Sequence, residues 1–189
     1  MNQVGYRYFT DKGLVGEAGL YYDFLIGANG IFIRAENRFI SATVCVGAAR
    51  VRGLQPMRTV VVLKQGKIPW HIYHAAISQM MADALHEQYL AVSWHDGYHL
   101  TYPQQVGDAA SCLYERVSDT VMEFHSHGLM RSFFSGVDNR DELGLQIYAV
   151  VGNLNMLIPE VKVRLGIYGY DVVPLRKAGF SVYAWQRMW

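Results

Sequence analysis

The sequence predicts an α/β fold, in which a mixed β-sheet is flanked by helices and preceded by a β-rich N-terminal region. Two observations lead to this prediction. Short runs of aromatic and β-branched residues, punctuated by glycine, fill the first third of the chain and return in its second half. Between them, one segment has apolar residues at helical spacing. We place a boundary at Gly66, which gives an N-terminal region of residues 1–66 and a main domain of residues 67–189.

The N-terminal region is predicted to consist of short strands and turns. Its glycines separate runs that are rich in tyrosine, phenylalanine, isoleucine and valine. The pair Asn29-Gly30 favours a tight turn between two of these runs. The expected strands cover residues 5–9, 20–26, 30–34, 39–46 and 59–63.

The main domain is predicted to open with a helix over residues 69–85. Pro69 suits a first helical turn, and apolar residues from Trp70 to Leu85 recur at helical spacing. Residues 109–116 fit a helix or a strand equally well. The expected strands cover residues 88–94, 98–102, 120–127, 146–151 and 161–166, with a last edge strand over 181–186.

The composition excludes several classes of protein. A content of 51% hydrophobic and 17% charged residues over 189 positions supports a folded core. Lys and Arg number 17 against 16 Asp and Glu, so charge does not indicate a nucleic-acid partner. Two cysteines are too few for a disulfide framework. We see neither a signal peptide nor an apolar run that could cross a membrane, and we expect a cytoplasmic protein.

One constellation of residues indicates metal chemistry. His125 and His127 are two apart, so on a strand both imidazoles point to the same face. Asp138 follows His127 by 11 positions, which lets a loop fold its carboxylate back over the histidines. Ser135 can cap a short helix and place Asp138 in its first turn. Two histidines and one carboxylate form a ligand set that leaves an open position on Zn²⁺.

The spacing of these residues resembles a known family. His-x-His, seven residues, Ser, two residues and Asp is the pattern of the JAMM (MPN-plus, JAB) zinc metalloproteases, and it is complete here except that Gly128 replaces the usual proline. A closer resemblance, over roughly residues 69–170, is to the JAMM-like proteins of bacterial PRTRC gene clusters. It is carried by residues 125–128, 133–138, 141–142, 150–152 and 164–169.

The resemblance implies a fold, an activity and partners. The fold is an α/β sandwich like that of cytidine deaminases. The activity is that of a zinc-dependent isopeptidase, a deubiquitinase-like hydrolase that cleaves after the C-terminal tail of a ubiquitin-like protein, in a precursor or a conjugate. Activating-type and conjugating-type enzymes of the same operon are implied as partners. The alternative is a catalytically silent JAMM-fold module that binds such a partner, and a small-molecule amidase is a weaker third possibility.

The resemblance also implies roles for particular residues. His125, His127 and Asp138 would bind the zinc ion, and Ser135 would donate a hydrogen bond to the developing oxyanion. JAMM enzymes use an upstream glutamate as general base, for which we choose Glu87. Glu123 remains the rival, because strand alternation places it on the same face as the two histidines; Glu36 and Glu17 are less favoured. Asp141 and Glu142 either orient a ligand or are ordinary acids in a first helical turn.

Overall fold

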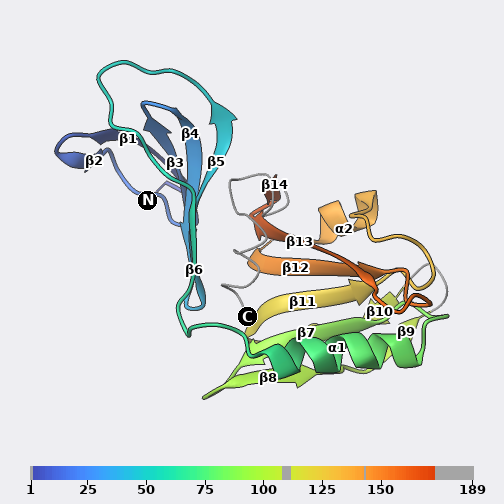
Figure 1. The fold of residues 1–189 in the computed structure, drawn as a ribbon. Coiled ribbons are helices and arrows are strands. Elements are labelled where there is room, and N and C mark those ends of the chain that lie inside the picture. Colours follow the sequence, from blue (N-terminus) through green and yellow to red (C-terminus); the bar gives the residue numbers. More distant parts are fainter. Residues whose placement is uncertain (1, 108–111, 143, 173–189) are drawn as a thin grey trace. The chain divides into compact units, whose positions relative to one another are not determined.

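The chain folds into two compact units that divide between Gly66 and Lys67. The computed structural model describes residues 2–107, 112–142 and 144–172 (Figure 1). Over these residues the protein is mixed α/β, mostly sheet with two helices, and each unit is built on a six-stranded sheet. The strand predicted over 181–186 lies outside the described residues.

The sheet of the first unit has the strand order β2-β1-β3-β4-β5-β6. All its neighbouring strands are antiparallel except β1 and β3, which are parallel. Five of its strands match the predicted ones, and the short β2 was not predicted. The tight turn between β3 and β4 lies one residue earlier than predicted, since it consists of Ala28 and Asn29, and Gly30 already begins β4. The strands are β1 (Val4–Thr10), β2 (Gly13–Val15), β3 (Tyr22–Gly27), β4 (Gly30–Glu36), β5 (Ile40–Ala48) and β6 (Val60–Leu63).

The sheet of the second unit has the strand order β14-β13-β12-β11-β7-β8. Its only parallel neighbours among the described strands are β11 and β12. A separate hairpin of β9 and β10 lies apart from this sheet, and it settles part of the ambiguous segment 109–116 as strand. The elements are β7 (Tyr89–Trp94), β8 (Tyr98–Thr101), β9 (Gln105–Gly107), β10 (Cys112–Tyr114), β11 (Thr120–Ser126), β12 (Leu145–Gly152), β13 (Glu160–Ile167) and β14 (Tyr170–Val172).

The two faces of the second sheet differ in chemistry. Alternation along the strands, combined with the register between them, sorts the side chains into two sets. One face is apolar and buried, and it carries Leu90, Val92, Met122, Phe124, Ile147, Ala149, Val163 and Leu165. The opposite face is polar, and it carries Tyr89, Glu123, His125, Tyr148 and Arg164. We refer to it as the polar face.

Helix α1 (Trp70–Ala82) covers the apolar face. Its buried residues are Ile72, Ala76 and Met80. Gln88, whose register places it on this face, donates from its side-chain amide to the carbonyls of Met80 and Asp83. The helix ends at Ala82 rather than at 85 as predicted, since the backbone of Asp83 is no longer helical and the Gln88 amide satisfies the carbonyl of Met80. No helix of the described part of the chain is long and apolar enough to cross a membrane.

Candidate metal centre

The candidate site lies at the end of strand β11, where the chain leaves the sheet. Strands β11 and β12 are parallel, so the chain must cross over between them and cannot turn back in a hairpin. The crossover begins at His127, whose backbone N–H donates to the carbonyl of Val151 at 2.8 Å. It also carries helix α2 (Gly136–Asp141). The crossover therefore brings the ligands that follow β11 back towards the end of that strand.

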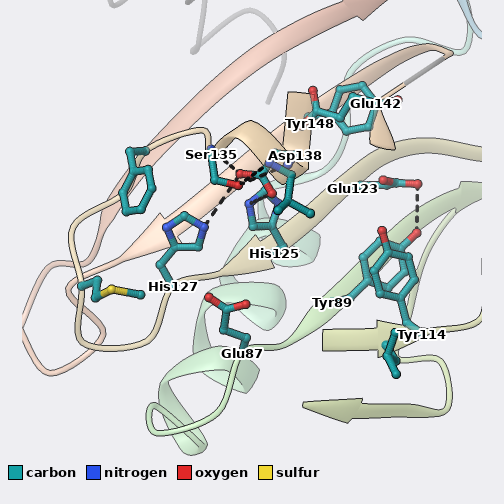
Figure 2. A pocket seen from close by; sticks show the side chains of 14 residues that line it. Glu87, Tyr89, Tyr114, Glu123, His125, His127, Ser135, Asp138, Glu142 and Tyr148 are labelled. Carbon is teal, nitrogen blue, oxygen red and sulfur yellow. Dashed lines mark hydrogen bonds and ion pairs between the residues drawn. The ribbon is translucent and has the colours of Figure 1, made fainter. Parts of the chain in front are cut away.

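The three predicted metal ligands converge. Ligand atoms of His125, His127 and Asp138 all lie within 4.8 Å of one another, and this group could hold a metal ion. Nε2 of His125 is 3.3 Å from Oδ1 of Asp138, and Nε2 of His127 is 4.0 Å from Oδ2. Figure 2 shows the two imidazoles turned towards this carboxylate. Two imidazoles and one carboxylate are a donor set that suits zinc.

Ser135 and Asp138 form the predicted cap of helix α2. The Ser135 hydroxyl oxygen accepts from the backbone N–H groups of Val137 and Asp138, each at 3.2 Å. The Asp138 carboxylate accepts in return from the backbone N–H of Ser135, which completes a capping box. The prediction of a short helix with Asp138 in its first turn is confirmed. The capping box fixes the rotamer of the carboxylate that faces the histidines.

The electrostatics of the site suit metal binding. Burial lowers the pKa of His127, and the adjacent His125 acts in the same direction against the opposing effects of Asp138 and the Arg131 backbone. Burial alone would raise the pKa of Asp138. The contact with His125, its charge and the donors of Ser135 outweigh burial and hold this pKa well below its ordinary range. A neutral imidazole and an ionised carboxylate are the forms that bind metal ions.

Unpartnered buried atoms test whether these residues fit a metal ion. Within the described part of the chain, Nε2 of His125 and Nδ1 of His127 are buried and have no hydrogen-bond partner. The 3.3 Å approach of His125 to Asp138 lacks the geometry of a hydrogen bond. A buried polar atom without a partner is costly in free energy. A cation beside Nε2 of His125 would remove that cost, so the residues fit a bound metal.

A cavity of about 430 Å³ opens onto the three ligands. All the residues that the sequence singles out for metal binding or catalysis line it, and so does the rival base. The set is Glu87, Glu123, His125, His127, Ser135 and Asp138. The hairpin of β9 and β10 contributes to the wall of this cavity through Leu113 and Tyr114.

The register between β7 and β11 places Glu87 beside the histidines. His125 lies opposite Tyr89 in this antiparallel pair, and the backbone N–H of Ser126 donates to the carbonyl of Gln88. One step further, Glu87 faces His127 from the same side of the sheet. Figure 2 shows its carboxylate pointing towards the two imidazoles. Glu87, which lies two residues before β7, therefore enters the site from a segment other than that of the histidines.

Glu123 shares the cavity but has a different environment. The hydroxyl of Tyr89 donates to its carboxylate at 3.0 Å, and the ring of Tyr89 is stacked on Tyr114 with centroids 3.6 Å apart. Figure 2 shows the Glu123 carboxylate turned towards Tyr89. Burial raises the pKa of Glu123, although the hydrogen bond from Tyr89 and the nearby amide of Gln146 act against this. The two candidate bases thus differ in where their carboxylates point.

The sequence analysis did not identify Arg164 as part of the site, and one of its two alternatives for Glu142 is wrong. Glu142 does not lie in a first helical turn, because helix α2 ends at Asp141. Its buried carboxylate accepts from Nε of Arg164 at 2.6 Å. Burial raises the pKa of Glu142 to about 7, against the lowering effect of Arg164. Arg164 itself was not predicted, since its separation from Asp138 in the sequence leaves no local signal. The side chain of Asp141 lies outside the described part of the structure.

Models of known protein families give no match to this chain, and curated proteins give none either. The interpretation of the site therefore rests on the spacing of its residues and on their geometry.

Proposed function

We propose that this protein is a zinc-dependent isopeptidase or peptidase of the JAMM type. It would cleave after the C-terminal tail of a ubiquitin-like protein, in a precursor or in a conjugate, within a bacterial ubiquitin-like system. The observation that carries the proposal is the convergence of His125, His127 and Asp138 in one cavity with Ser135 and Glu87. A silent binding module has no need of a complete ligand set beside a serine and an acid.

The metal ligands would come from three residues of two elements. His125 and His127 lie at the end of β11, and Asp138 lies in the first turn of α2. When bound there, zinc supplies Lewis-acid activation of water and of a carbonyl oxygen. The remaining steps belong to side chains of the protein.

Glu87 would act as the general acid and base. Hydrolysis adds the OH of water to the carbonyl carbon, breaks the C–N bond and delivers a proton to the leaving nitrogen. A carboxylate on the open side of the ligands can accept the proton of the attacking water and pass it to that amine. The approach of Glu87 from the segment before β7, opposite His127, supports this role.

Ser135 would stabilise the oxygen on which negative charge develops. Its oxygen accepts two backbone hydrogen bonds within α2, and its hydroxyl hydrogen, which can also point to the Asp138 carboxylate, can be donated to a substrate oxygen. Ser135 lines the cavity with the ligands, where such a donor can reach the carbonyl oxygen of a bound substrate. Removing a donor of this kind typically lowers kcat by about 10²–10³.

An experiment on the full chain tests the proposal. We would measure zinc content and cleavage of a fusion in which the C-terminal tail of a ubiquitin-like protein is joined to a reporter protein. We expect wild type to bind one zinc ion and cleave, and His125→Ala to lose both properties. Undiminished cleavage by His125→Ala would rule out the proposed mechanism. Stoichiometric zinc and partner binding without cleavage would instead favour the silent binding module.

The two glutamates form a matched pair for the same assay. Glu87→Gln and Glu123→Gln each replace one carboxylate of the cavity by an amide of the same shape. We expect Glu87→Gln to keep its zinc and lose about 10²–10⁴ in kcat, the range typical of a general base. Glu123→Gln should keep most of its activity. The opposite result would assign the base to Glu123 and leave the metal centre unchanged.

A further inference from the structure

Helix α2 carries Asp138, but its own structure does not fix its position over the sheet. The helix has only six residues, and isolated helices shorter than about 12–15 residues are marginal in water. The capping box of Ser135 and Asp138 sets the local conformation of the first turn. It does not determine how far the turn lies from His125. A contact from outside the helix must hold α2 in place.

Arg164 of strand β13 supplies such contacts on both sides of Asp138. Its Nε donates to Oε2 of Glu142 at 2.6 Å, and its Nη1 donates to Oδ1 of Asn139 at 2.7 Å. Its guanidinium carbon lies 3.8 Å from the centre of the Phe134 ring. Phe134 precedes the cap of α2, Asn139 lies within the helix and Glu142 ends it. One rigid side chain thus ties three points of the crossover to the sheet.

The burial of this ion pair favours a role in geometry over one in stability. The side chains of Arg164 and Glu142 are 6% and 5% exposed. A buried ion pair gains little net stability, because desolvation of the two charges offsets their attraction. A planar guanidinium does, however, fix the direction of two hydrogen bonds at once, which a lysine cannot do. The pair Arg131 and Glu160 is a contrast, since their atoms lie 3.6 Å apart and Arg131 is 81% exposed.

We propose that Arg164 is a positioning residue that holds Asp138 against His125 and His127 and thereby sets the metal affinity of the site. This inference rests on the proposed metal centre. Arg164 lies on the polar face opposite Tyr148, two strands away from the histidines. Its hydrogen bonds to Asn139 and Glu142 connect it to Asp138 through α2.

The test measures zinc affinity by competition with a chromophoric chelator, and records the visible absorption spectrum of the Co²⁺-loaded protein. Asn139→Ala removes a single contact of Arg164 at an exposed residue, so the fold should persist. Arg164→Lys keeps the positive charge but loses the planar guanidinium that directs two hydrogen bonds at once. We expect both variants to bind zinc about 10–100-fold more weakly than wild type, as is typical for residues that orient a ligand. We also expect an altered Co²⁺ spectrum. Arg131→Met is the matched control and should bind zinc like wild type.

A double variant separates a loss of zinc affinity caused by misplacing Asp138 from one caused by unfolding of the protein. Arg164→Met alone would leave the Glu142 carboxylate buried without its cation, so it is combined with Glu142→Gln. Thermal unfolding of the metal-free protein identifies variants that fold. A folded double variant with wild-type zinc affinity, or an Asn139→Ala variant with wild-type affinity and spectrum, would overturn the role of Arg164 while the metal centre stands. A wild type that binds no zinc would overturn both proposals.

Discussion

Among the strands that the structure describes, each unit contains one parallel pair, and the two pairs differ in what joins them. In the first unit, β1 and β3 are joined by residues 11–21, which include the short strand β2. In the second, β11 and β12 are joined by residues 127–144, which include helix α2. Parallel neighbours require a crossover, so both units must anchor an excursion of the chain to the sheet.

In both units a carboxylate accepts a hydrogen bond from the backbone of this excursion. In the first unit, Asp23 accepts from the backbone N–H of Gly19 at 2.7 Å and pairs with Arg7 at 3.3 Å. In the second, Asp138 accepts from the backbone N–H of Ser135. Only Asp138 has imidazoles beside it, because β11 ends in a His-x-His sequence. An acid that accepts from the backbone of a crossover is thus structural by default, and two histidines at the strand end make it a candidate ligand.

Replacing Asp138 and Asp23 by asparagine should separate the role of a metal ligand from a purely structural role. The loss of zinc affinity in Asp138→Asn is the largest effect that we predict. Asp138→Asn should lower zinc affinity by at least about 100-fold, since changes that only orient a ligand already cost that much. Asp23→Asn should leave zinc affinity unchanged and lower the free energy of unfolding by about 1–3 kcal/mol, because buried partners lose a charge-assisted hydrogen bond. Chelator competition and urea unfolding measure the two quantities. Equal zinc affinity in Asp138→Asn and wild type would remove Asp138 from the ligand set.

The ligand group could be predicted from sequence because its information is local. His-x-His on a strand gives a shared face, and the spacing of Ser135 and Asp138 gives a cap. The choice between Glu87 and Glu123 could not be made this way. Alternation places Glu123 with the histidines, whereas only the register between β7 and β11 brings Glu87 opposite His127.

Other features depended on contacts that are distant in the sequence. Helix α1 ends at Ala82, where the distant Gln88 rather than a further helical turn satisfies the carbonyl of Met80, so periodicity alone made the predicted helix too long. Arg164 reaches the site only because β13 pairs with β12. The strands β2, β9, β10 and β14 have three residues each, and pairing with neighbours, rather than their own composition, defines them.

One glycine in or beside each crossover allows the two units to be compared a second time. We expect its substitution to have an intermediate effect on the free energy of unfolding. A Cβ atom on Gly152 would collide with the backbone of Ser132 and Met130 in the crossover that follows His127. In the first unit, a Cβ atom on Gly19 would collide with the backbone of Gly5. We expect Gly152→Ala and Gly19→Ala each to lower the free energy of unfolding by about 1–3 kcal/mol, as overpacking does. Only Gly152→Ala should also weaken zinc binding.

The matched control for these glycines lies within helix α2. A Cβ atom on Gly136 would meet only open space, and its φ is not positive. Gly136→Ala should therefore leave stability unchanged or raise it by up to about 1 kcal/mol. Urea unfolding and chelator competition on the three variants check both expectations. Weaker zinc binding in Gly19→Ala would show that the two crossovers are not independent, and would break the comparison.

The smallest effect is expected from the exposed ion pair of the first unit. Lys64 Nζ lies 2.5 Å from Oε1 of Glu36, and this contact lowers the pKa of Glu36 below about 4.5. An acid whose pKa is lowered by folding adds stability above its ordinary pKa, and that stability disappears as the pH falls through the folded value. Lys64→Met should therefore be slightly less stable than wild type near pH 7 at low salt.

The difference should vanish at about 1 M salt and at strongly acid pH, because exposed pairs are screened and Glu36 becomes protonated. Zinc affinity should not change, unlike in the variants of the buried Arg164. Thermal unfolding over a pH series measures the effect, and a difference that grew towards acid pH would contradict the assigned sign.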